Sequence, residues 1–98
     1  MANEVAQDKK YIVLINGKAY QMNKQAMLGV ILQAAKLFHN TSRKMIYFAI
    51  KGNTAIAKKD EFDTYDELDA ATKQYEAYGF KVYSTQTPLQ DIEDEKNR

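Results

Sequence analysis

Carboxylates are the most concentrated reactive groups in this sequence, with seven of them from Asp60 to Glu76. Clustered carboxylates can hold a cation or exchange protons. A calcium loop, however, also needs a central glycine and oxygen ligands at alternating positions, and a transition-metal site needs nearby histidine or cysteine. The stretch has neither pattern. Thr64 and Glu67 instead form a capping box, and acids in the first turn favour the positive end of a helix dipole. These carboxylates therefore predict a helix start and no metal site.

Other groups that carry out catalysis are scarce. Cysteine is absent, and His39 is the only histidine. It falls at the predicted C-terminal end of a helix, where an imidazolium is stabilised without any catalytic role. The four glycines fall in two turns, a helix cap and a helix surface, so none belongs to a phosphate-binding loop. The sequence predicts a protein that is not an enzyme, with no catalytic residues, no cofactor and no metal.

Charge is distributed unevenly along the chain. Residues 1–59 contain ten basic and two acidic side chains, a net charge of +8, whereas residues 60–98 carry −7. Such asymmetry indicates a surface for nucleic acid, an acidic contact surface, or two halves that interleave and neutralise each other. Only Arg43 and Arg98 are arginine. Because base reading in the major groove relies on bidentate arginine, a sequence-specific reader of duplex DNA is not expected.

The first half of the chain predicts a hairpin followed by a helix. Asn16-Gly17 divides KYIVLINGKAYQM into two strands and is the preferred pair for a type I′ turn. Asn23 is a good N-cap, so a helix is expected from Lys24 to about Phe38. Its apolar residues, including Leu37, predict a buried face, whereas Leu32 lies at the boundary of the polar side. Gly29 on that polar side suggests either tolerance or close approach by another chain.

The second half predicts another hairpin, a helix and a final strand. MIYFAIKGNTAIAKK contains a two-residue turn at Gly52-Asn53. The helix that Thr64 begins should end near Tyr78, with Gly79 as its left-handed C-terminal residue. KVYST then supplies the last strand.

These elements predict the fold class α+β in the order ββαββαβ. We expect a two-layer sandwich, a mostly antiparallel sheet of about five strands with two helices on one face, as a variant of the ferredoxin-like plan. Residues 1–10 are expected to be a flexible N-terminal segment and residues 11–85 a single domain. Residues 86–98 are expected to be an acidic tail that is disordered or forms a short helix.

Two helices on one face would leave the other face of the sheet uncovered. Alternation along the strands assigns to that face several tyrosines and apolar residues, which we predict to bind a partner: Tyr11, Tyr20, Met45, Tyr47, Ile56 and Tyr83. A second assignment of the first hairpin stays open. Met22 as a staple residue would draw Tyr20 and Val13 toward the helix side and expose Ile12 and Leu14 instead.

The leading hypothesis is a small non-enzymatic protein-binding module that uses the open sheet face for self-association as a homodimer, or as an adaptor or inhibitor. One alternative is single-stranded nucleic-acid binding, in which sheet tyrosines stack on bases and lysines hold phosphates: Lys18, Lys44, Lys51, Lys58 and Lys81. A minor alternative is an acidic decoy that blocks a nucleic-acid-binding protein through Asp63, Asp66, Asp69 and Glu76.

The compartment is predicted from what the sequence lacks. It shows no basic segment followed by an apolar run at its start and no apolar stretch long enough to span a membrane. We therefore expect a cytoplasmic protein without membrane contact. The lysine bias, short length and absence of cysteine suit an accessory protein of an AT-rich bacterium, phage or plasmid.

Overall fold

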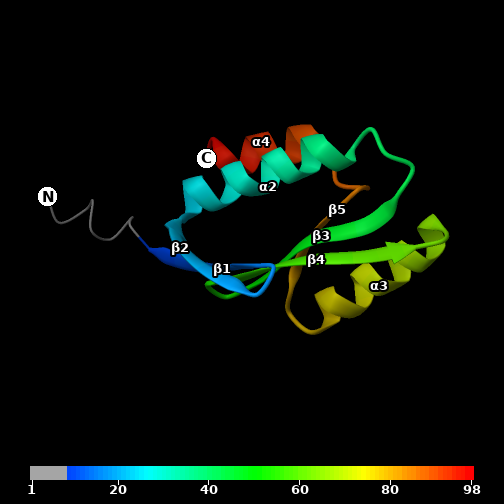
Figure 1. The fold of residues 1–98 in the computed structure, drawn as a ribbon, viewed down its shortest axis with the longest axis horizontal. Helices are drawn as coiled ribbons and strands as arrows, with labels where there is room; N and C mark the ends of the chain where they lie inside the picture. Colours follow the sequence, from blue (N-terminus) through cyan, green and yellow to red (C-terminus); the bar gives the residue numbers. More distant parts are fainter. Residues whose placement is uncertain (1–8) are drawn as a thin grey trace, which may run out of the picture.

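The computed structural model describes residues 9–98 and contains five strands and three helices in an α+β arrangement (Figure 1). The first eight residues of the segment expected to be flexible lie outside the described residues. The elements in chain order are β1 (Lys10–Ile15), β2 (Lys18–Asn23), α2 (Lys24–Phe38), β3 (Lys44–Lys51), β4 (Thr54–Phe62), α3 (Tyr65–Ala77), β5 (Lys81–Ser84) and α4 (Leu89–Lys96).

Local signals place the element boundaries in the first half. Asn16 and Gly17 both have positive φ, 52° and 81°, as a type I′ turn requires. The Asn23 side chain accepts a hydrogen bond from the Ala26 N–H at 2.9 Å, which satisfies a backbone donor at the start of α2. The predicted turn and cap are confirmed.

Local signals also determine where α3 begins and ends. The Thr64 hydroxyl accepts a hydrogen bond from the Glu67 N–H at 3.1 Å. At the other end Gly79 has a φ of 93°, and the Phe80 N–H donates to the Tyr75 carbonyl at 3.1 Å. The Tyr75 and Phe80 rings then meet edge to face at 5.6 Å, the apolar contact that accompanies this kind of helix end.

The sheet is mixed, with strand order β2-β1-β4-β3-β5. β1 and β4 are parallel, whereas the other three neighbouring pairs are antiparallel. In the ferredoxin-like plan the last strand would lie beside the strand that precedes the first helix. Here β5 lies beyond β3, at the edge opposite β2, so the ferredoxin-like prediction is wrong.

Helices cover both faces of the sheet. In Figure 1, α2 and α4 lie on one side of the strands and α3 lies on the other. The cause is the strand order. The crossover from β2 to β3 and that from β4 to β5 move in the same direction across the sheet, but β2 and β4 point in opposite directions. Two crossovers of the same hand then place their helices on opposite faces. The prediction of two helices on one face is wrong.

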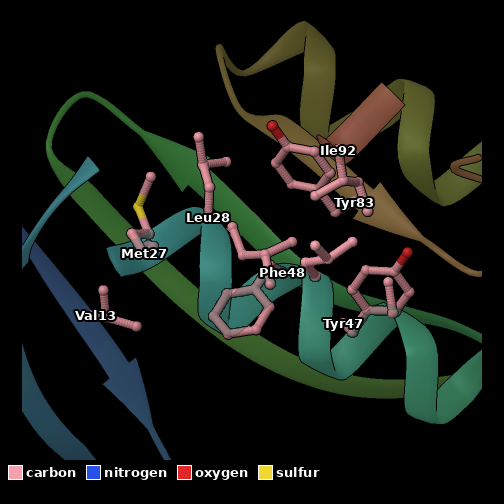
Figure 2. Close-up of a cluster of buried hydrophobic side chains, with 11 residues drawn as sticks. Val13, Met27, Leu28, Tyr47, Phe48, Tyr83 and Ile92 are labelled. Atoms are coloured by element: carbon pink, nitrogen blue, oxygen red, sulfur yellow. The ribbon is translucent and has the colours of Figure 1, made fainter. Parts of the chain in front are cut away.

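The core divides accordingly into two clusters. The larger lies between the sheet and α2 with α4, and it includes Val13, Leu28, Phe48 and Ile92 (Figure 2). The smaller lies under α3 and is built from Ile46, Leu68 and Val82 with partly buried neighbours. Ile46 and Phe48 are two residues apart on β3, yet they belong to different clusters, because the register of the strand shifts between them and interrupts the alternation of its side chains.

The acidic C-terminal segment contributes to this core. Its helix α4 packs beside α2 in the opposite direction: the Gln25 side chain donates to the Lys96 carbonyl at 2.6 Å at one end. At the other end His39 bonds the Thr87 carbonyl at 2.9 Å. Because α4 covers one flank of α2, Leu32 is buried, whereas Leu37, expected on the buried face, is 72% exposed.

Candidate functional site

Three of the residues predicted to form an open tyrosine face are buried. Tyr47 is 2% exposed, Tyr83 is 5% exposed, and Met45 is also buried. Both tyrosines belong to the cluster under α2 and α4, where the Tyr47 ring stacks on Phe38 with centroids 6.2 Å apart. The predicted exposure of these three residues is wrong.

A strand irregularity explains part of this error. The register of β3 against both neighbours shifts between Ile46 and Phe48. As a result Tyr47 and Phe48, which strict alternation would place on opposite faces, belong to the same buried cluster. The sequence of the strand contains no glycine or proline that would have marked the bulge.

The other three residues of that prediction are dispersed. Tyr11 is half-buried against the α2 cluster, and Tyr20 is 46% exposed on β2, where it pairs with Val13. Ile56 is half-buried and pairs with Leu14 and Ala49. The six residues therefore form no common surface.

The five lysines of the nucleic-acid hypothesis are also divided. Four of them hold their ammonium groups over aromatic rings of the protein, with Nζ to ring-centroid distances of 5.3 to 5.5 Å: Lys44 on Tyr65, Lys51 on Phe80, Lys58 on Tyr75 and Lys81 on Tyr83. Lys18 lies at the tip of the first hairpin. Of the sheet tyrosines available to stack on bases, Tyr47 and Tyr83 are buried, whereas Tyr20 is 46% exposed.

The acids of the decoy hypothesis are exposed along and before α3: Asp63, Asp66, Asp69 and Glu76. Asp69 forms an ion pair with Lys73 at 3.1 Å, which reduces the net negative charge of this surface. Within residues 9–98, no group of three or more histidine, cysteine or acidic side chains could hold a metal ion.

Among residues 9–98, no element covers an apolar surface on the α3 side of the sheet. We call it the apolar strip and define it by Ile12, Leu14 and Ile56. Ile12 and Leu14 alternate along β1 with Val13, which is buried under α2, so both point to the α3 side. Leu14 pairs with Ile56 across the parallel β1–β4 ladder. Ile12 is 40% exposed, and the other two are half-buried.

The apolar strip is exposed because α3 packs elsewhere. The buried cluster under α3 draws on β3 and β5, through Ile46 and Val82, together with Phe62 at the end of β4. On the neighbouring edge strand β2, the residues opposite Leu14 and Ile12 are Ala19 and Gln21, and both are exposed. Within residues 9–98, the part of this sheet face formed by β1 and the start of β4 is therefore apolar and has no helix over it.

Polar and aromatic groups border the apolar strip toward α3. Lys58 follows Ile56 on the same face of β4 and lies over the Tyr75 ring. Hydrogen bonding to the Tyr75 hydroxyl raises the pKa of Lys58, so its ammonium stays charged. Beyond it lies a shallow hollow, whose lining includes Phe62, Tyr75 and the exposed Tyr78. An apolar centre with a rim of lysine and tyrosine is typical of a protein-contact surface.

The sequence contained one signal for this surface. The staple position of Met22, next to the Asn23 cap, predicts that Val13 and Tyr20 share its side of the hairpin and that Ile12 and Leu14 do not. Met22 is indeed packed against the cluster under α2, so this second assignment of the hairpin is confirmed.

No helix within the described residues is long and apolar enough to cross a membrane. No family model, curated protein or solved structure matches this chain.

Proposed function

We propose that this chain is a small non-enzymatic protein-binding module whose contact surface is the apolar strip. The observation that carries the proposal is the 40% exposure of Ile12 on the interior strand β1, with Leu14 and Ile56 beside it. Exposed contiguous apolar surface with a polar rim is a common feature of contact sites.

The chemistry of the surroundings supports the same proposal. Branched aliphatic side chains on a sheet are rigid, so their burial by a partner costs little rotamer entropy. Lys58 and Tyr78 at the border offer a charge and a hydroxyl for hydrogen bonds at the edge of an interface. Of the six residues predicted for the contact face, Ile56 belongs to this surface, and Ile12 and Leu14 belong to the second assignment of the first hairpin.

A comparison of three baits tests the proposal. Wild-type protein, Ile12→Glu and Leu37→Glu are immobilised and exposed to lysate of the source cell, and bound proteins are quantified by mass spectrometry. Leu37 is a matched control because it is an exposed leucine on α2, on the other side of the molecule. We expect specific proteins to bind wild-type and Leu37→Glu baits and to be depleted at least tenfold on Ile12→Glu, because a buried carboxylate without a partner costs several kcal/mol.

Thermal unfolding of both variants provides the folding control. Equal retention of every protein by all three folded baits would contradict a contact surface at the apolar strip.

A further inference from the structure

Within the part of the chain that the structure describes, strand β2 is an edge strand without the usual protection. It lies at the end of the strand order and pairs over all six residues with β1, without a bulge. Its sequence, KAYQMN, has one charged residue and no proline, and its first four residues are exposed. Natural edge strands are normally short, charged, bulged or covered. The opposite edge, β5, has four residues, three of them buried.

The hairpin turn determines which backbone groups of β2 face outward. Residues that flank a two-residue turn form a hydrogen-bonded pair, here Ile15 and Lys18. By alternation Lys18, Tyr20 and Met22 direct their N–H and C=O groups toward β1. Ala19 and Gln21 therefore direct theirs away from the sheet, where another strand can bond them.

We propose that β2 pairs with β2 of a second copy of this chain, antiparallel, with Tyr20 opposite Tyr20 at the twofold axis. In this register Ala19 of each copy exchanges both backbone hydrogen bonds with Gln21 of the other. Lys18 lies opposite Met22. The two sheets join into one continuous sheet, and Tyr20, which is 46% exposed, gains an aromatic cross-strand pair.

Charge favours this register over one of its two symmetric neighbours. The next symmetric register, centred on Gln21, would place Lys18 opposite Lys24 of the second copy, and like charges directly opposite are destabilising. The register centred on Tyr20 brings no like charges opposite each other within β2. An edge that complements itself in this way selects a second copy, because the same surface serves both partners.

The dimer is independent of the proposed function, because it uses the edge of the sheet and not the apolar strip. The two surfaces are nevertheless related by geometry. A twofold axis between antiparallel strands is perpendicular to the sheet, so both copies present their apolar strips on the same side. The pairing would therefore produce a bivalent contact surface.

Cysteine scanning tests the register, since the chain has no cysteine of its own. Tyr20→Cys is expected to form a disulfide-linked dimer in a glutathione buffer, because residues facing each other at a non-hydrogen-bonded pair have Cα atoms about 4.5 Å apart. Lys18→Cys is the matched control. Its two copies would be about 13 Å apart along the strands and should stay reduced. Gln21→Cys reports the neighbouring register.

Light scattering tests the pairing without cysteine. Wild-type protein is expected to show twice the 11.2 kDa chain mass at high concentration. Gln21→Pro should be monomeric, because proline removes an outward N–H and is tolerated at an edge strand. Gln21→Ala keeps this N–H and should remain dimeric. A monomeric wild type, a dimeric Gln21→Pro, or cross-linking at residue 18 as strong as at residue 20 would each overturn the proposal.

Discussion

The Tyr47 hydroxyl is buried and has no hydrogen-bond partner among residues 9–98. An unsatisfied buried hydroxyl costs about 1–3 kcal/mol. We predict that Tyr47→Phe, which keeps the ring stacked on Phe38, raises the free energy of unfolding at pH 7 by about 1 kcal/mol in urea denaturation. Tyr78→Phe is the control, because Tyr78 is mostly exposed. A lower free energy of unfolding for Tyr47→Phe would instead mean that the Tyr47 hydroxyl makes a hydrogen bond in the folded protein.

The same residue predicts the response to alkaline pH. Burial, and secondarily the neighbouring Tyr83, raises the pKa of Tyr47 far above its usual value of 10.0. Burial and then Glu95 raise the pKa of Tyr83 as well. Because a raised pKa favours the neutral form in the folded state, the stability is intact below pH 10 and decreases as pH rises above it. Circular dichroism against pH should show alkaline unfolding, with a higher midpoint for Tyr47→Phe and an unchanged one for Tyr78→Phe.

At the scale of elements, α4 determines how α2 is buried. Ile92 is fully buried in the large cluster, and the Lys24–Glu95 ion pair at 3.2 Å joins the ends of the two helices. This contact also accounts for Gly29. A Cβ there would lie 3.7 Å from Cε of Lys96, an ordinary contact within the chain, so close approach by a second chain is not required.

We predict that Ile92→Ala lowers the free energy of unfolding by about 2–4 kcal/mol, the usual cost of a cavity in a packed core. Leu37→Ala should change it by less than about 0.5 kcal/mol, because Leu37 is exposed. Urea denaturation of both variants measures the difference. Equal effects would show that α4 does not pack on α2 in solution.

At the scale of the whole molecule, the fold brings the basic and acidic halves together. Arg43 pairs with Glu61 at 3.1 Å, and Lys24 pairs with Glu95, each joining a residue of the basic half to one of the acidic half. Such pairing reduces the positive potential that would attract phosphates.

We therefore predict no appreciable binding of single-stranded oligonucleotides at low salt. Two of the sheet tyrosines of that hypothesis, Tyr47 and Tyr83, are buried, so they cannot stack on bases. Fluorescence anisotropy with labelled oligonucleotides checks this. Binding that weakens steeply with added salt would contradict the prediction and favour the nucleic-acid hypothesis.

Sequence alone determined the turns and caps and the elements that they bound, because turns and caps depend on neighbouring residues. Asn16-Gly17, Asn23, Thr64 and Gly79 each require a local backbone geometry that few other residues supply as well. In the first hairpin, the alternation of side chains divided the residues between two faces, and the staple residue Met22 identified which face is buried. Periodicity failed at Tyr47, because a bulge reverses the alternation without a local signal.

Only the tertiary structure decided which surface stays exposed. The strand order depends on pairings between distant segments, such as β1 with β4, and no short-range pattern encodes them. This order sends α3 to the opposite face from α2, over β3 and β5, which leaves Ile12 exposed on that face. The position of α4 was likewise undetermined, because a short helix with few apolar residues is stable only when packed against another element.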